Sequence, residues 1–261
     1  MAKQTGLGAR FAVGGYDLGG DIQALSSVSG GVPNPIISTD ITQSAQARMS
    51  SVLAADGLPA GLYDGGMAAS VYFDPASNAS HSQFAALPTV SSLFTFGAGA
   101  AAGSVVANLV AKQIDYPGNR GQDGSFLFSV TAQESDGIPL EWGYSLTTWG
   151  QSVSGAGNLT SLDLGSASPG AFGASFHMHT FSFTGTSVTF KIQESSDNGA
   201  GDAFADVVGG GFTAVSAAHG WQRIETAAIN VERYLRVVAT GTFSAWTGVI
   251  MVQRRNALKS W

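Results

Sequence analysis

The sequence predicts a mainly β protein, and two observations carry that prediction. Apolar and polar residues alternate with a period of two along many stretches, and glycine is frequent, with 35 among 261 residues. We expect a β-sandwich with one flanking helix and a long β-hairpin over residues 1–150. A C-terminal all-β module of sandwich or jelly-roll type is expected over residues 151–261. The Gly/Ser-rich stretch 150–157 is interpreted as the linker between them.

The long hairpin, residues 104–135, is the best-defined expected element. Its strands are predicted at Ser104–Tyr116 and Ser125–Ser135, where bulky residues such as Phe128 and Val130 fall on one face. The connecting loop has turn chemistry at both ends and supplies the candidate assembly residues Pro117, Gly118, Asn119, Arg120, Gly121, Gln122 and Asp123. Strands of this length exceed the usual five or six residues. We therefore expect a neighbouring subunit to bury the far end of the hairpin.

The other predicted elements of the first half are shorter. A helix near residues 40–55, capped by Thr39 or Asp40, follows from the spacing of its apolar residues. A second, short helix is predicted at His81–Leu87, ending before Pro88. Predicted strands are Arg10–Val13, Ile22–Val28, Met67–Phe73, Val90–Phe96 and Leu140–Thr148.

The second half reads as a series of short strands with turns between them. These strands are predicted at Leu159–Leu164, Phe172–Phe183, Ser187–Glu194, Trp221–Thr226, Glu232–Thr240 and Ala245–Val252. Thr184-Gly185-Thr186 and Asp197-Asn198-Gly199 are the clearest predicted turns.

Composition narrows the class of function. Only 11% of the residues are charged, which favours a surface that becomes covered by other protein. The net charge is −6, so the excess of basic residues that is typical of a nucleic-acid-binding protein is missing. No apolar run has the length of a membrane span or the character of a secretion signal, so we expect synthesis in a cytoplasm and no membrane partner.

Two motifs could bind a metal. His177 and His179 share one strand face at a spacing that can chelate, but a hydrogen-bonded surface pair is the favoured interpretation. The acidic stretch from Asp197 to Asp202, followed by Asp206, has oxygen ligands suited to calcium, yet it lacks the register of a known calcium loop and is interpreted as a turn. No metal or cofactor is therefore expected.

No catalytic set is predicted either. Glu134, Asp136 and Glu141 could in principle supply a glycosidase-like acid and base, but such carboxylates are common on solvated surfaces. Arg254 and Arg255 with Lys259 make a small basic end, interpreted as solvated. We expect no enzyme activity and no catalytic residue.

Three segments carry a resemblance to a known family. The opening AKQTGLGARFAVGGYDLGGDI, the stretch VAKQIDYPGNRGQDGSFLFSVTAQ with its EWG sequel, and KIQESSDNGAGDAFADV with ERYLRVVATGTF resemble the major tail (tail tube) proteins of long-tailed bacteriophages that infect actinobacteria. The resemblance implies a virion protein that forms stacked, hexameric rings around a hollow tube. It also implies contacts with other copies, with the tape measure and tail terminator proteins, and a lumen that passes DNA without specific binding. The C-terminal module would lie on the tube exterior.

Two other classes of function stay open. One is a capsid decoration or minor tail protein whose C-terminal module binds carbohydrate, with Trp149, Trp221 or Trp246 as stacking platforms. Burial in the core is the simpler expectation for at least two of these tryptophans. The other is a secreted carbohydrate-active enzyme, disfavoured by the missing signal peptide and acid/base context.

Overall fold

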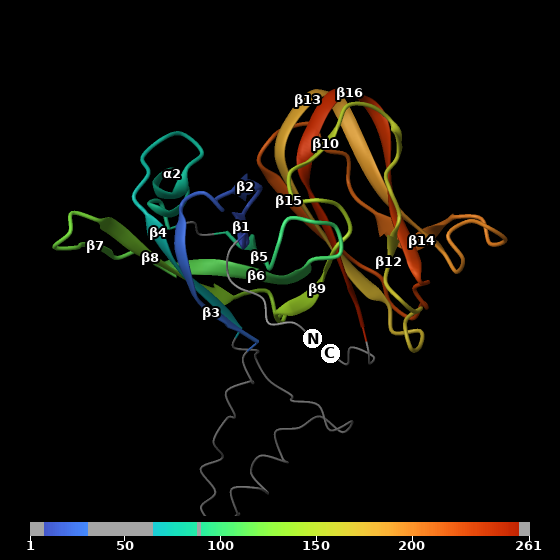
Figure 1. The fold of residues 1–261 in the computed structure, drawn as a ribbon, viewed down its shortest axis with the longest axis horizontal. Helices are drawn as coiled ribbons and strands as arrows, with labels where there is room; N and C mark the ends of the chain where they lie inside the picture. The colour runs from blue at the N-terminus through green and yellow to red at the C-terminus, as the bar shows by residue number, and fades with distance from the viewer. Residues whose placement is uncertain (1–7, 31–64, 88–89, 256–261) are drawn as a thin grey trace, which may run out of the picture.

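The computed structural model describes residues 8–30, 65–87 and 90–255, and the predicted helix near 40–55 lies outside them. The mainly β fold is confirmed: strands are the predominant secondary structure of the described chain, which has one short helix, α2 (Ser80–Phe84). One continuous sheet path runs β14-β13-β16-β9-β6-β5-β1-β2. Figure 1 shows this path bent into two lobes, which we call the first lobe (described residues up to 149) and the second lobe (residues 150–255).

The first lobe is built from antiparallel strands of ordinary length, except for one long pair. Its strands are β1 (Arg10–Val13), β2 (Tyr16–Asp17), β3 (Ile22–Ser29), β4 (Gly66–Tyr72), β5 (Ser92–Gly97), β6 (Val105–Asp115), β7 (Gly118–Arg120), β8 (Phe126–Glu134) and β9 (Glu141–Ser145). Alternation explains their faces, since Met67, Ala69 and Val71 of β4 are buried while the residues between them are partly exposed.

Pairing in the first lobe follows an almost closed circuit. β3 pairs with β4, β4 with β8, β8 with β6, β6 with β5, and β5 with β1, all antiparallel. Between β1 and β3, the described strands make no ladder. The circuit encloses a cluster that includes Phe11, Phe94, Leu109 and Val130. The first lobe is thus an incomplete barrel with one gap between β1 and β3.

The second lobe is organised by two very long strands, β13 (Ala174–Ser195, 22 residues) and β16 (Tyr234–Arg254, 21 residues), paired along nearly their whole length. Shorter strands flank them: β10 (Gln151–Val153), β11 (Gly157–Asn158), β12 (Leu162–Asp163), β14 (Ala205–Gly211) and β15 (Gly220–Glu225). Their side chains enclose a second hydrophobic cluster around Phe176, Phe190, Leu235 and Trp246.

The prediction of short strands in the second half was wrong at two places. Phe172–Phe183 and Ser187–Glu194 are parts of one strand, and so are Glu232–Thr240 and Ala245–Val252. Gly185, predicted as a turn centre, lies where both strands are bulged, with Phe243 opposite. A Cβ on Gly185 would approach Cα of Phe243 to 2.4 Å, so glycine is needed for close backbone contact and not for chain reversal.

The other predicted elements agree with the structure within a few residues. The strands at 10–13, 22–28, 67–73 and 90–96, both hairpin strands and the short helix all form, whereas β14 was not predicted. The stretch interpreted as a linker contains β10, whose Val153 is buried against β16. A third cluster, which includes Val106, Trp149 and Met251, joins the lobes. Their independence as two domains stays a prediction.

Candidate assembly site

The hairpin of the first lobe extends beyond the barrel as an arm, which we define as residues 116–128. β6 pairs with β8 only at Ala111–Asp115 against Thr131–Glu134, and beyond that point β7 takes over as the partner of β8. Figure 1 shows β7 and the start of β8 projecting away from both lobes. Of the predicted loop, Gly118, Asn119 and Arg120 therefore form a strand, and the reversal is confined to Gly121–Ser125.

The tip of the arm is held by its own polar groups. The Gly121 N–H donates to the Ser125 carbonyl (2.7 Å), and Oδ1 of Asp123 accepts from the N–H (3.0 Å) and Oγ (2.7 Å) of Ser125. These hydrogen bonds from Ser125 lower the pKa of Asp123. Gly124, with φ +88°, supplies the left-handed conformation that closes the turn. The tip is an ordered turn with its polar side chains in solvent.

The candidate residues present their backbone on a free edge. Pro117 O accepts from the Ser129 N–H (2.9 Å), and Gly121 also faces β8. Because alternate residues of an antiparallel strand point their backbone groups to opposite sides, those of Gly118 and Arg120 point away from β8. β7 has no other partner among the described strands. Pro117 through Arg120 are all exposed, so the arm offers an unpaired strand edge to solvent.

An aromatic cluster stiffens the base of the arm. The rings of Tyr116 and Phe128 stack with centroids 4.5 Å apart, and Phe126 and Phe73 lie 5.0 Å apart. Phe84 of α2 contacts Tyr116 from the barrel side. Burial, with a contribution from the charge of Asp21, raises the pKa of Tyr116. These contacts fix the direction in which the arm leaves the barrel.

Exposed apolar side chains lie on and beside the arm. Phe126 is 43% exposed, Ile114 55% and Tyr72 47%. Phe126 and Tyr72 belong to adjacent strands, because Tyr72 pairs with Leu127. Exposed aromatic groups at this density are typical of surfaces that become covered by another protein.

The two histidines predicted as a surface pair are fully buried, so the surface assignment was wrong. Both are 0% exposed and face the first lobe from β13. His177 Nε2 contacts Oε2 of Glu141 (2.7 Å), whereas Nε2 of His179 contacts Oγ1 of Thr95 (2.8 Å). Nδ1 of His179 accepts from the Gly15 N–H (3.1 Å), so its Nε2 carries the proton when the ring is neutral. Each histidine is a hydrogen-bonding link between lobes.

Glu141 is the centre of the contact between lobes and not a surface carboxylate. It is 2% exposed and pairs with the guanidinium of Arg223 through two bonds of 2.7 Å. Burial alone would raise its pKa, but the hydrogen bonds from Arg223 and the charge and hydrogen bond of His177 outweigh burial and hold the pKa well below its usual range. A general acid needs the opposite shift, so this site does not suit acid catalysis.

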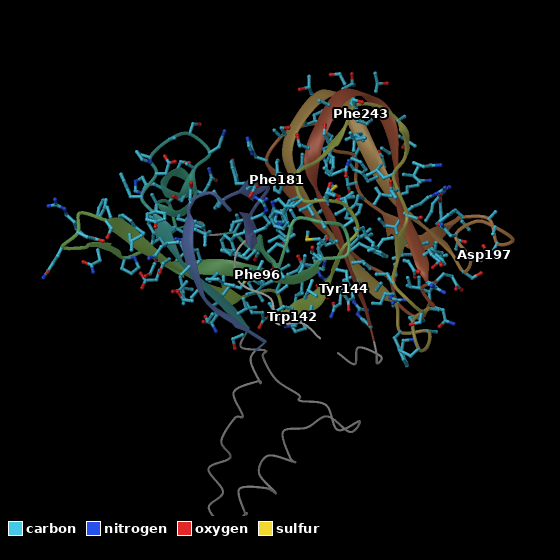
Figure 2. The ribbon with its side chains drawn as sticks, viewed as in Figure 1. Phe96, Trp142, Tyr144, Phe181, Asp197 and Phe243 are labelled. Atoms are coloured by element: carbon cyan, nitrogen blue, oxygen red, sulfur yellow. The ribbon has the colours of Figure 1, made fainter. Side chains whose placement is uncertain are left out.

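The remaining predicted positions also have structural explanations. Asp197 accepts from the N–H groups of Ala200, Gly201 and Asp202, which makes the predicted turn at the far end of the second lobe (Figure 2). Within the described ranges, no group of three or more His, Asp or Glu side chains could hold a metal ion. Arg255, interpreted as solvated, is 8% exposed and pairs with Glu225 (2.6 Å).

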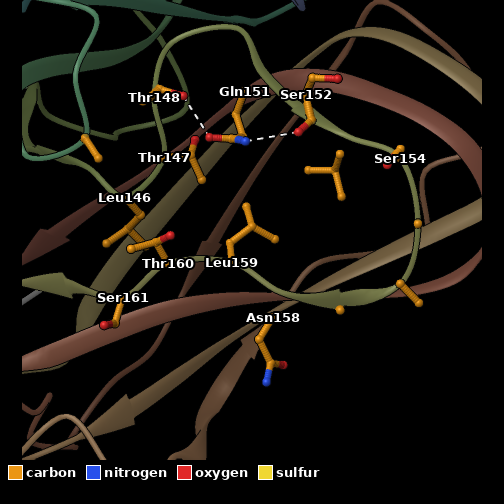
Figure 3. Close-up of a pocket in the computed structure, with 15 residues that line it drawn as sticks. Leu146, Thr147, Thr148, Gln151, Ser152, Ser154, Asn158, Leu159, Thr160 and Ser161 are labelled. Carbon is orange, nitrogen blue, oxygen red and sulfur yellow. Dashed lines mark hydrogen bonds between the residues drawn. The ribbon is translucent and has the colours of Figure 1, made fainter.

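A groove of about 670 Å³ lies mainly in the second lobe and reaches Ala102 and residues 146–148 of the first lobe (Figure 3). Its lining is rich in hydroxyl and amide groups and includes Thr147, Gln151, Ser154, Asn158 and Thr160, with no charged side chain. None of the three tryptophans considered as stacking platforms lines it; Trp246 and Trp149 are buried and Trp221 is partly exposed. The groove was not predicted; residues 150–157, which form much of its lining, were interpreted as a linker.

Comparisons with known proteins give little more. No family model matches the chain, and no curated protein matches it. Among solved structures, the Dit (gp 19.1) protein of SPP1, described as a paradigm of the hub adsorption apparatus in phages that infect Gram-positive bacteria, aligns with 94% of this chain and 98% of its own. The identity is 12% and the TM-score 0.27, values too low to support an argument about fold or function. No helix of the described residues is long and apolar enough to cross a membrane.

Proposed function

We propose that this protein is a structural protein of a bacteriophage tail, whose copies form stacked hexameric rings that make a hollow tube for DNA. The observation that carries the proposal is the arm, which leaves the barrel with an unpaired strand edge and exposed aromatic side chains. The sequence resemblance to tail tube proteins supplies the class of assembly.

The surface chemistry suits self-association and a passive conduit. Only 11% of the residues are charged, and the net charge is −6. A lumen lined by such subunits gains little counterion release from DNA phosphates, so the duplex would pass without being held. A contact between the arm of one copy and a different surface of the next copy is heterologous, and repeated contacts of this kind close into rings or continue as filaments. In this proposal the second lobe lies outside the tube, and tape measure and tail terminator proteins are its other partners.

Electron microscopy with a matched pair of variants tests the proposal. We expect the purified, concentrated protein to form rings or tubes of uniform diameter. Deleting residues 118–123 should abolish them while far-UV circular dichroism stays that of a folded protein. Val208→Ser, which changes a 73% exposed side chain of the second lobe, is the control and should assemble normally. Normal tubes from the deletion variant would exclude the arm as the assembly element.

A second candidate function rests on the groove of the second lobe. A neutral lining of hydroxyl and amide groups suits an uncharged, polyhydroxylated ligand, as expected of a decoration or minor tail protein that binds carbohydrate. A glycan array with the full chain and with Asn158→Leu tests this alternative. Binding that the substitution abolishes would support it, and no binding by the unmodified chain would exclude it.

A further inference from the structure

The gap between β1 and β3 is a cavity of about 620 Å³ with an open strand edge beside it. Its walls include Arg10, Phe11, Ile22, Leu25 and Phe96. Gly19 also lines it, and a Cβ on Gly19 would lie 3.2 Å from Oδ1 of Asp17 and 3.7 Å from Cδ of Arg10. β3 runs along the cavity with β4 as its partner on one side and no described strand on the other. Among the described strands, the barrel is open only along this edge.

Arg10 is an unusual lining residue of this gap. Its Nε is buried without a hydrogen-bond partner among the described residues, and no described carboxylate forms an ion pair with its guanidinium. By contrast, the partly buried Arg223 and Arg255 of the second lobe both pair with carboxylates. Arg10 as a whole is partly exposed and only its Nε is buried, so its guanidinium is accessible to an acidic partner from outside the described chain.

The arm offers an unpaired strand edge and an acidic side chain, and the gap has an unpaired edge and the guanidinium of Arg10. The arm carries a free strand edge at Gly118 and Arg120, and Asp123 at its tip is exposed, with Ser125 of the same turn as its hydrogen-bond partner. An arm cannot serve its own gap, because β8 lies on the far side of β4 from the free edge of β3. The complementary strand edge and the opposite charge therefore point to another molecule of the same chain.

We propose that the arm of a second copy adds to the free edge of β3, with its Asp123 paired to Arg10 in the gap. Main-chain hydrogen bonds between the two edges would bind the strands, and the ion pair would set their register. The contact joins different surfaces of the two copies, so it propagates from copy to copy. This inference rests on the proposed function only in taking a second copy as the partner.

Disulfide trapping tests the contact directly, because the natural chain has no cysteine. Gln122→Cys at the tip and Ser26→Cys on β3 both replace exposed side chains. The two variants are mixed, oxidised and analysed by mass spectrometry for the linked peptides. We expect a disulfide between residues 122 and 26 of different molecules. Thr242→Cys, exposed on the second lobe, replaces Ser26→Cys in the control and should give no such link.

A charge exchange tests the ion pair. Arg10→Asp and Asp123→Arg should each lower the assembled fraction in sedimentation by on the order of tenfold, because like charges then meet. The double variant should restore assembly. Failure of the double variant to recover, together with absence of the 122–26 disulfide, overturns the inference. Tubes that form without this disulfide overturn the inference and leave the proposed function standing, whereas arm deletion without effect on tubes overturns both.

Discussion

The two lobes differ in how completely their own strands enclose the hydrophobic core. In the second lobe, β13 and β16 stay paired over about twenty residues and bring their own flanking strands, so the core is closed by the chain itself. In the part of the first lobe that the structure describes, the barrel is closed on every side but one, and an arm extends outward. The first lobe has unpaired strand edges at the gap and on the arm, which suits it to pairing with a neighbouring copy. The second lobe covers its core with its own strands, which suits it to a position outside such an assembly.

Trp246→Ala should have the largest effect on stability. Trp246 is 0% exposed, donates from Nε1 to Oγ1 of Thr180 (3.0 Å) and packs on Phe190 at 4.6 Å. Removing it from a closed core should lower the free energy of unfolding by about 3–5 kcal/mol. The measurement is urea denaturation. Trp142→Ala, at a 49% exposed site on the first lobe, is the control and should cost less than about 1 kcal/mol. Similar losses would contradict the contrast between a closed core and an open surface.

Arg223→Met tests the contact between lobes. The substitution leaves Glu141 buried without its main cationic partner, which should cost about 3 kcal/mol or more. Lys191→Met removes one side of the exposed pair with Asp206 and should cost less than about 1 kcal/mol. Thermal unfolding of both variants gives the comparison. Equal effects would mean that the buried network adds nothing beyond a surface ion pair.

Acid should weaken the same contact. Burial, and after it the charge of His177, lowers the pKa of His179 from 6.5 to about 3, so the unfolded chain takes up this proton before the folded chain does. Stability should therefore fall as the pH decreases from 6.5 to about 3. Glu141, whose folded pKa is lowered, adds a further loss below about pH 4.5. The measurement is the unfolding midpoint against pH. His179→Gln should flatten the upper part of that curve, and an unchanged slope in this variant would contradict the assignment.

Gly118→Ala should have the smallest effect on stability but a clear effect on the arm. A Cβ at this position would lie 2.5 Å from the ring of Phe128, so either β7 or that ring must shift, and the packing between β7 and β8 loosens. The global free energy of unfolding should change by less than about 1 kcal/mol, because few core contacts depend on β7. Hydrogen exchange at Asn119 and Leu127 should quicken. Gly20→Ala, with no atom within 4 Å of its Cβ and no positive φ, is the control for added bulk alone.

How far the sequence could predict this molecule depends on how local each feature is. The arm was predictable because alternation and turn residues at Pro117–Gly124 are local signals. The continuity of β13 and β16 was not, because Gly185 looks like a turn until its partner, nearly 60 residues away, is known. The same applies to His179, whose partners Thr95 and Gly15 lie 84 and 164 residues away. The burial of both histidines therefore needed the tertiary structure.

β9 has a mechanical consequence for the proposed tail assembly when it is under tension. This five-residue strand is the ladder's link between the lobes, joined to β6 by four residue pairs and to β16 by only two, at Ser145 and Tyr144. A pull on the arm travels through β8 and β6 into β9 and reaches the second lobe across that short step. The load on this step is shared by the other contacts between the lobes: the Arg223–Glu141 pair at the first residue of β9, the hydrogen bonds of His179, and the cluster around Trp149. The buried carboxylate of Glu141 therefore reinforces the sheet beside its shortest ladder between the lobes.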